Sequence, residues 1–278
     1  MININGDLTN SETDFLHSNR GFLFGDAVFE TMKIVDNQIL FLEDHYFRLM
    51  ASMRIIRMQI PMNFTMEFFE NEVLKTTIEN KHSDSARARI TVYRNAGGLY
   101  TPTTNTISYF IETSILESKT YCSSNNLYEV DLFKDFYIPK HLLSTLKTTN
   151  KLVNVVGSIF AKENDLQNCL LLNENKNVVE ALNGNLFMLF EKKLITPPLS
   201  EGCLNGIMRK QILKIAKKIN NLEVVEAPIS PFDLQKSDEL FISNTIVGIQ
   251  AISKYRKKEY SADLSNSLTE KLNFFANI

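Results

Sequence analysis

Three kinds of group in this sequence could take part in chemistry: a lysine amine, an arginine guanidinium and the start of a helix. Lys147, in LKTTNKL, can attack an aldehyde when its amine is neutral, a state that burial or a neighbouring cation favours. Arg48, in HYFRL, can form forked hydrogen bonds with phosphate oxygens. The stretch Asn205–Arg209 begins a helix, and free N–H groups at a helix start bind anions. The ordinary alternatives are a solvated lysine and an arginine exposed on an amphipathic helix.

Other common kinds of site are not indicated. The four histidines are far apart and form no H-x-x-x-H pair, and the three cysteines form no C-x-x-C pair, so we predict no metal site. No phosphate-binding loop, G-x-G-x-x-G motif or G-x-S-x-G motif occurs. The histidines and cysteines are His17, His45, His82, His141, Cys122, Cys169 and Cys203.

Length and charge narrow the class of protein. The 278 residues allow one large or two medium domains, and 44% apolar with 22% charged residues is ordinary for a globular chain. A net charge of −2 provides no basic field for nucleic acid or anionic lipid. No apolar run approaches the roughly 18 residues of a membrane span, and the first ten residues lack a secretory pattern. We expect a cytoplasmic enzyme or binding protein with reduced thiols.

Elements that would position these groups follow from periodicity and turn residues. Helices are predicted at 43–58, 64–80, 150–163 and 206–219, with an amphipathic helix near the C-terminus after an edge strand. Strands are predicted at 38–42, 87–93, 106–112, 127–133, 169–172, 186–190, 194–195, 223–226 and 239–243. The polar stretch 117–126 is the best linker, which separates a small N-terminal α/β domain, residues 1–116, from a larger domain, residues 127–278. Composition and spacing alone lead to a two-domain α+β protein and no further.

Five segments, in order along the chain, resemble those of the class IV aminotransferase family, the fold-type IV pyridoxal-phosphate enzymes. They are RGFLFGDAVFET (20–31), HYFRLMAS (45–52), LKTTNKL (146–152), VVEALNGNLF (178–187) with TPPLSEGCLNGIMR (196–209), and DELFISNTIVGI (238–249). The resemblance implies a two-domain α+β fold with the cofactor, pyridoxal 5'-phosphate, between the domains. It also implies a homodimer, because in this family the site is completed across a subunit interface.

By this resemblance, Lys147 of the K-x-x-N pattern, which ends at Asn150, is the lysine that forms the Schiff base and moves the substrate α-proton. Glu180 matches the glutamate that faces the pyridine nitrogen and keeps it protonated. Arg48 matches the arginine that binds the cofactor phosphate, and His45 beside it is either a supporting residue or a core histidine.

The remaining phosphate contacts are also implied by the resemblance. The backbone N–H groups of Ile207 and Met208 would bind phosphate, although many family aminotransferases carry a threonine where this chain has Met208. Thr245 matches a threonine whose hydroxyl binds phosphate, and Asn244 would help through its backbone or side chain. An ordinary turn at the end of a strand is the alternative for these last two residues.

Substrate contacts are predicted at four positions. Phe29 and Thr31 lie in the segment that lines the substrate side in the family, with core packing as the alternative. Arg94 precedes a Gly97-Gly98 loop that approaches the site in these enzymes, and it would suit a substrate carboxylate unless it is a surface arginine. Lys151 stands where many relatives carry a tyrosine that contacts the cofactor ring oxygen.

The resemblance implies a cofactor more directly than a reaction. All members act on an amino-acid-like substrate through an external aldimine, and the protein then directs the outcome. NGIMR, ISNTIVGI and the basic Lys151 favour 4-amino-4-deoxychorismate lyase, an enzyme of folate biosynthesis that releases 4-aminobenzoate and pyruvate. A branched-chain or D-amino-acid transaminase is the first alternative. A non-catalytic protein that binds the cofactor, or only keeps the fold, is the second.

Overall fold

The computed structural model describes residues 1–9, 18–122 and 126–278, so His17 and residues 123–125 of the predicted linker lie outside the described residues. The chain forms two compact units. The first unit comprises Met1–Lys119 and Lys147–Asn150, and the second comprises Thr120–Leu146 and Lys151–Ile278. The division at Lys119 falls within the predicted linker. The sequence did not indicate that the short segment with Lys147 belongs to the first unit.

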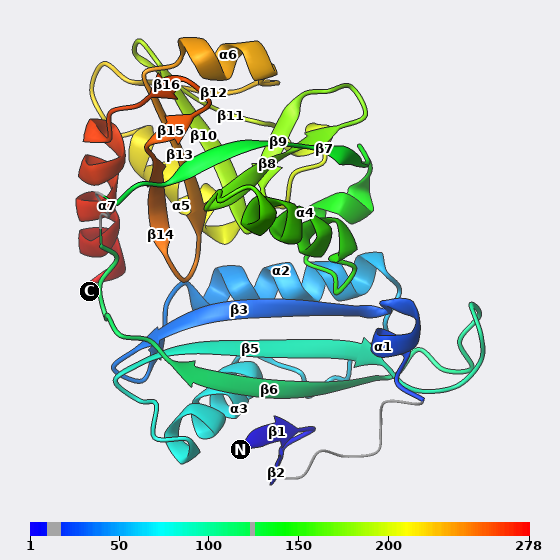
Figure 1. The fold of residues 1–278 in the computed structure, drawn as a ribbon. Helices are drawn as coiled ribbons and strands as arrows, with labels where there is room; N and C mark the ends of the chain where they lie inside the picture. Colours follow the sequence, from blue (N-terminus) through cyan, green and yellow to red (C-terminus); the bar gives the residue numbers. More distant parts are fainter. Residues whose placement is uncertain (10–17, 123–125) are drawn as a thin grey trace. The chain divides into compact units, whose positions relative to one another are not determined.

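The first unit is built on a six-stranded antiparallel sheet in the order β2-β1-β6-β5-β3-β4 (Figure 1). Its strands are β1 (Ile2–Ile4), β2 (Asp7–Thr9), β3 (Ala27–Val35), β4 (Gln38–Ile39), β5 (Ser85–Arg94) and β6 (Ile107–Ile115). Its helices are α1 (Arg20–Phe24), α2 (Leu42–Ile55) and α3 (Met66–Glu79).

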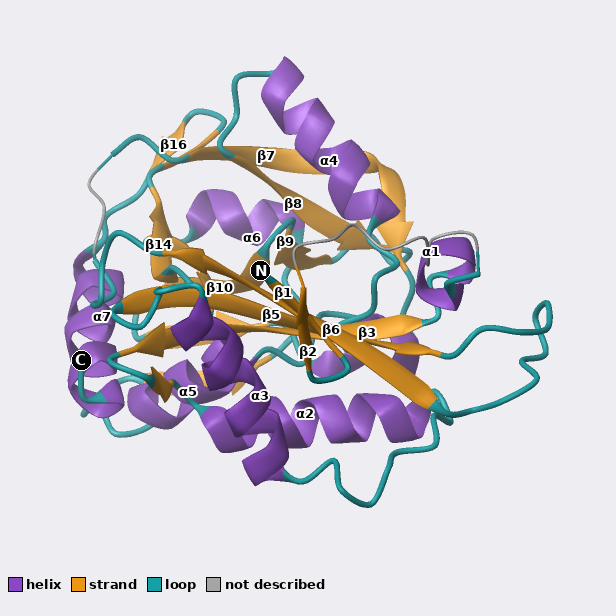
Figure 2. Ribbon diagram, turned by 90° about the horizontal axis from the view of Figure 1, so that it is seen from below, coloured by secondary structure: helices purple, strands orange, loops and turns teal. Residues whose placement is uncertain are grey.

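One face of this sheet is covered by α2 and α3, as Figure 2 shows. Both helices are amphipathic and begin and end close to the predicted bounds. Their apolar sides, with Leu49, Met53, Phe69 and Val73, form one buried cluster with the strands. The hydroxyl of Thr65 accepts a hydrogen bond from the Phe68 N–H and caps α3.

Strand β3 was not among the predicted strands, although it pairs with β5 along its whole length. Eight of its nine residues are buried and the ninth, Phe29, is partly buried. A strand covered on both faces has no alternation between polar and apolar residues, which is the pattern that identifies most strands. This strand carries Phe29, Glu30 and Thr31 of the site described below.

The second unit contains a ten-stranded sheet in the order β12-β11-β10-β9-β8-β7-β15-β16, with β13 paired to β10 and β14 paired to β13. Its strands are β7 (Glu129–Ile138), β8 (Asn168–Asn173), β9 (Val178–Ala181), β10 (Gly184–Phe190), β11 (Lys193–Thr196), β12 (Glu223–Glu226), β13 (Glu239–Asn244), β14 (Gly248–Ile252), β15 (Lys254–Tyr255) and β16 (Lys258–Glu259). Its helices are α4 (Leu152–Glu163), α5 (Ile207–Ala216), α6 (Pro231–Lys236) and α7 (Asp263–Ala276), with 3₁₀ turns at Leu142–Thr145 and Leu199–Glu201.

Helix α5 is the element of this unit that matters most for the site. It packs against β13 and α7, and eight of its ten residues are buried. Its N-cap residue, Gly206, makes no side-chain hydrogen bond to the first turn. The N–H groups of that turn are therefore not occupied by a capping side chain.

Candidate functional site

Lys147 lies beside strand β3 in the first unit. The Phe29 N–H donates to the Lys147 carbonyl at 2.9 Å, and the Thr149 N–H donates to the Ala27 carbonyl at 3.1 Å. The partly buried Lys147 side chain places its Nζ 4.5 Å from the centroid of the Phe29 ring. Two residues that were predicted from separate motifs are thus brought together.

Asn150, the last residue of the K-x-x-N pattern, joins the lysine segment to the Arg20–Thr31 motif. Its side-chain amide donates to the Gly25 carbonyl at 3.1 Å. Gly25 ends α1 with φ +64°, and a Cβ at this position would overlap the Asn150 side chain. Glycine is therefore required both by the left-handed backbone and by the contact with Asn150.

Arg48 is held in the first unit by a buried carboxylate that the sequence analysis missed. The Glu30 side chain accepts from Arg48 Nε at 2.7 Å and from Nη2 at 2.5 Å, which is a forked arrangement. Burial opposes ionisation of Glu30, but Arg48 and His45 outweigh it and lower the pKa of this carboxyl to about 2. An acid in the mostly apolar stretch AVFETMKIV was the signal that could have identified it.

His45, one turn before Arg48 on α2, is fully buried and lies 2.7 Å from Glu30 through Nδ1. Burial lowers the pKa of His45, so its ring is neutral at pH 7 and Nδ1 donates to the carboxylate. Nε2 is then an acceptor, and it has no hydrogen-bond partner among the described residues. His45 is thus a supporting residue of the Arg48 site.

A second missed residue, Arg89, lies on the face of β3 and β5 that carries Phe29 and Thr31. Thr31 is paired with Arg89 and Phe29 with Thr91, and paired residues share a face. The partly buried Arg89 guanidinium lies 4.1 Å from the Phe29 ring centroid, and burial lowers its pKa. In the described part of the chain, buried Arg89 Nε and buried Thr91 Oγ1 have no partner.

Arg94 has a different environment from the one predicted. Its guanidinium donates to Asp26, to the Asn105 side chain and to the carbonyls of Ile56 and Arg57, and only 7% of its side chain is exposed. Substrate binding by Arg94 would require some of these hydrogen bonds to break. Asp26 is shared with Arg20, which also donates to carbonyls of the 97–99 loop. In this structure, Arg20 is the arginine that holds that loop, and Arg94 joins Asp26 to Asn105 and to the carbonyls that end α2.

In the second unit, Glu180 on β9 is 9% exposed and its Oε2 accepts from the Leu204 N–H at 2.8 Å. Asn185 on β10 is paired with Glu180, and its amide donates to the Leu204 carbonyl at 2.8 Å. Two neighbouring side chains on adjacent strands therefore bind the N–H and the carbonyl of the same residue, Leu204. Leu204 lies directly before the turn that starts α5.

The Ile207 and Met208 N–H groups stand in the first turn of α5 and have no acceptor among the described residues. The Gly206 N–H already donates to the Leu204 carbonyl at 2.8 Å. Both residues are buried and their side chains are apolar, so the backbone N–H groups are the only polar donors that they could offer a ligand. Free N–H groups together with the helix dipole favour an anion at this end.

Asn244 and Thr245 follow strand β13 in a closed turn. Asn244 Oδ1 accepts from the N–H groups of Ile246 at 3.0 Å and Val247 at 2.9 Å, and its amide donates to the Asn183 carbonyl at 3.1 Å. The Thr245 carbonyl accepts from the Tyr121 hydroxyl at 3.0 Å. Asn244 is therefore used within the turn, while a role of either residue in phosphate binding stays a prediction.

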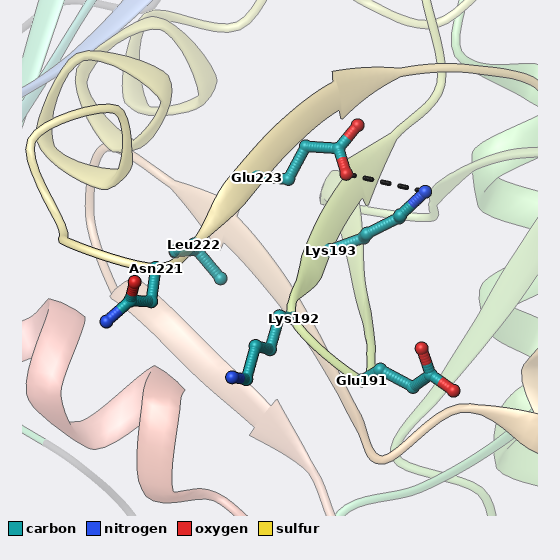
Figure 3. Close-up of a pocket in the computed structure, with 6 residues that line it drawn as sticks. All are labelled: Glu191, Lys192, Lys193, Asn221, Leu222 and Glu223. Carbon is teal, nitrogen blue, oxygen red and sulfur yellow. Dashed lines mark ion pairs between the residues drawn. The ribbon is translucent and has the colours of Figure 1, made fainter.

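The remaining predicted residue, Lys151, is the N-cap of α4 in the second unit and is partly buried. Its carbonyl accepts from the Val155 N–H at 2.9 Å. A surface hollow elsewhere in this unit is lined by none of the predicted site residues (Figure 3). Its exposed ion pair joins Lys193 to Glu223 at 3.4 Å, and we assign it no chemistry.

Neither a metal-binding cluster nor a membrane-spanning helix is found among the described residues. In the described part of the chain, no cluster of three or more histidine, cysteine or acidic residues could hold a metal ion. Among the same residues, no helix is both long and apolar enough to cross a membrane.

The chain is similar to known proteins over nearly its full length. It is 28% identical to a putative branched-chain-amino-acid aminotransferase of Methanocaldococcus jannaschii, over 91% of this chain and 86% of the relative. It is also 28% identical to a D-alanine aminotransferase of Listeria monocytogenes, over 84% and 80%. The crystal structure of 4-amino-4-deoxychorismate lyase from Pseudomonas aeruginosa matches with a TM-score of 0.85 and 21% identity, over 99% of this chain and 98% of that one. The family model for class IV aminotransferases matches residues 27–255, and the chain therefore belongs to this pyridoxal-phosphate-dependent family, with the two-domain α+β fold that the sequence predicted.

Proposed function

We propose that this protein is a 4-amino-4-deoxychorismate lyase that releases 4-aminobenzoate and pyruvate. In this proposal Lys147 binds the cofactor covalently, Glu180 faces its pyridine nitrogen, and Arg48 with the start of α5 holds its phosphate. The assignment of these roles rests on the family motifs.

The donor groups described above fit pyridoxal 5'-phosphate. The first unit offers an amine beside an aromatic ring and a partly buried guanidinium. The second offers a buried carboxylate and a helix start with two unpartnered N–H groups in the described structure. These groups suit an aldehyde, a phosphate and a ring nitrogen. When bound, the cofactor withdraws electrons from the carbon that carries the substrate amino group.

In the proposed reaction, the Lys147 amine removes the proton from that carbon. The bond from the neighbouring ring carbon to the enolpyruvyl oxygen then breaks, and the electron pair leaves with this oxygen. The released enolate takes up one proton on its terminal carbon, which balances the proton removed by Lys147, and becomes pyruvate, while the ring becomes aromatic. No second substrate is consumed, which is the chemical difference from transamination.

The turn at Asn244 is the observation that carries the lyase proposal. Asn244 occupies the N–H groups of Ile246 and Val247 with its own side chain. Branched-chain aminotransferases usually have a small G-T-A-A turn at this point, and its glycine, which stands where this chain has Asn244, has no side chain that could accept these hydrogen bonds. The asparagine-bearing turn is what the sequence resemblance to the lyases implied.

A cation near the lysine supports a substrate with carboxylates. The Arg89 guanidinium shares the Phe29 ring with Lys147. Its buried Nε has no acceptor among the described residues, so a carboxylate would satisfy it. The proposed substrate has two carboxylates, and we propose Lys151 for the other, with Phe29 and Thr31 lining the substrate side.

The second candidate is a branched-chain or D-amino-acid transaminase. It is favoured by the 28% identity to an archaeal branched-chain aminotransferase and to D-alanine aminotransferase, against 23% to the aminodeoxychorismate lyase of Vibrio harveyi. For either reaction we also propose a homodimer in the cytoplasm, on the basis of the family resemblance.

The decisive experiment supplies the cofactor-loaded protein with 4-amino-4-deoxychorismate and no keto acid. A lyase releases pyruvate steadily under these conditions. Strict dependence on added 2-oxoglutarate or pyruvate, with amino acids as substrates, would establish the transaminase instead. A preparation that takes up no cofactor, and so is neither yellow nor bleached by borohydride, would leave only a non-catalytic protein.

A further inference from the structure

We propose that Asn185 is a positioning residue for the phosphate end of the cofactor, acting through the backbone of residues 204–208. This inference rests on the proposed phosphate site at the start of α5. Neither the sequence motifs nor the roles given above assign a function to Asn185.

Asn185 lies in the middle of a row of buried polar residues in the sheet. Glu180, Asn185 and Ser243 are paired across the adjacent strands β9, β10 and β13, so their side chains lie in one row on one face. All three are buried, with exposed fractions of 9%, 4% and 2%. Ser243 Oγ has no hydrogen-bond partner among the described residues, which leaves a buried hydroxyl in this row for a ligand or water to satisfy.

Two residues of this row form hydrogen bonds with the backbone of Leu204. Its N–H donates to Glu180 and its carbonyl accepts from Asn185, so the peptide units on both sides of this residue are fixed from the row. The Leu204 carbonyl also accepts from the Gly206 N–H. The orientation of this carbonyl therefore sets the turn from which the Ile207 and Met208 N–H groups project.

Position 206 is glycine because of its contact with Asn185. Its φ of −73° and ψ of 136° suit any residue, so the backbone does not require glycine. A Cβ there would instead overlap Asn185 Oδ1 and lie 3.0 Å from Asn185 Cγ, and the next residue in contact would be Arg209, through its Cβ at 3.4 Å. Asn185 and Gly206 thus form one matched pair, and a change at one should alter the effect of a change at the other.

The test compares pyridoxal 5'-phosphate with pyridoxal, which lacks the phosphate. In Asn185→Ala, we expect the dissociation constant for the phosphorylated form to rise on the order of tenfold more than that for pyridoxal. The matched control is Asn168→Ala, a buried asparagine on β8 that bonds Tyr128 and Asn183 and does not touch the turn. It should change both constants by the same factor.

The pair is tested by a double-mutant cycle with the same two ligands. Gly206→Ala should weaken binding of the phosphorylated form in the native background and have little further effect when Asn185 is already alanine, because the overlap is then absent. If Asn185→Ala does not fold, Asn185→Asp is the substitute, because it keeps the size of the side chain but loses the donor to the Leu204 carbonyl. It should also weaken binding of the phosphorylated form more than binding of pyridoxal. Urea unfolding of each apo variant establishes that the folded state is compared.

Equal losses for both ligands in Asn185→Ala, or equal effects of Gly206→Ala in both backgrounds, would overturn this inference. The result is separate from the proposed function. Wild-type protein that binds the phosphorylated cofactor no better than pyridoxal would refute the phosphate site itself. Wild-type binding and lyase activity with an indifferent Asn185 would refute only the positioning role.

Discussion

At Lys147 the backbone and the side chain have separate tasks. The carbonyl pairs with the Phe29 N–H, whereas the amine lies over the Phe29 ring. Lys147→Ala should therefore keep the strand contact and the fold but abolish turnover and the visible absorbance of bound cofactor. Lys193→Ala, which alters only an exposed ion pair, is the control and should have native activity. Turnover in Lys147→Ala within tenfold of wild type would show that another amine does the chemistry.

Glu30 makes the stability of the protein depend on pH. Its pKa is lowered from an ordinary 4.5 to about 2, which means that the folded state stabilises the ionised carboxylate relative to the unfolded state. This contribution, on the order of 3 kcal/mol, is fully present above about pH 4.5 and is lost as the pH falls toward about 2.

Glu30→Gln tests this dependence. It leaves the Arg48 charge without its buried partner, so we expect a loss of about 3–5 kcal/mol at pH 7. The loss should shrink as the pH falls from 5 to 2, because the native protein is then losing the same ion pair. Free energies of unfolding in urea across this range measure the difference, and a loss independent of pH would contradict the assignment.

Sequence reasoning named some residues of the candidate site and missed others, for identifiable reasons. Lys147, Asn150 and Glu180 lie in local motifs, which can be read from the chain without its fold. Glu30 and Arg89 become notable only in the folded unit. The partners of Glu30 lie 15 and 18 residues away on α2, and Arg89 meets Phe29 only because β5 pairs with β3. The hydrogen bonds of Arg94 to Asp26, Asn105 and the end of α2 could not be foreseen from the sequence, which offered a substrate contact or a surface arginine.

At the scale of elements, the longer amphipathic helices and several short apolar strands were predictable, whereas the long buried strand β3 and the segment that pairs with it were not. Strand β12 was predicted with its observed bounds and α3 to within two residues at each end, since both have clear patterns. Strand β3 has no alternation, and the attachment of Lys147–Asn150 to the first unit is a long-range pairing with β3. Local periodicity carries no information on either.

Helix α7 depends on a cap that comes from a distant strand. The buried Glu239 side chain on β13 accepts from the Leu264 N–H at 2.8 Å and the Ser265 N–H at 3.1 Å, whereas the N-cap residue Ala262 has no capping side chain. Glu239→Ala should therefore destabilise the second unit by about 2 kcal/mol. Urea unfolding checks this value, with exposed Glu259→Ala as the control. A loss no larger than that of the control would mean that water replaces the cap.

At the scale of the whole molecule, the cofactor should act as a stabilising ligand. A ligand that binds only the native chain adds about 2.7 kcal/mol at a concentration 100 times its dissociation constant. Since the proposed ligands Lys147 and Arg48 belong to the first unit and Glu180 to the second, we expect pyridoxal 5'-phosphate to raise the unfolding temperature of both units. Calorimetry of the apo protein with increasing cofactor measures this rise. Pyridoxal should raise the temperature less, because Arg48 and the start of α5 then have no phosphate to bind, and equal shifts with the two compounds would argue against both phosphate contacts.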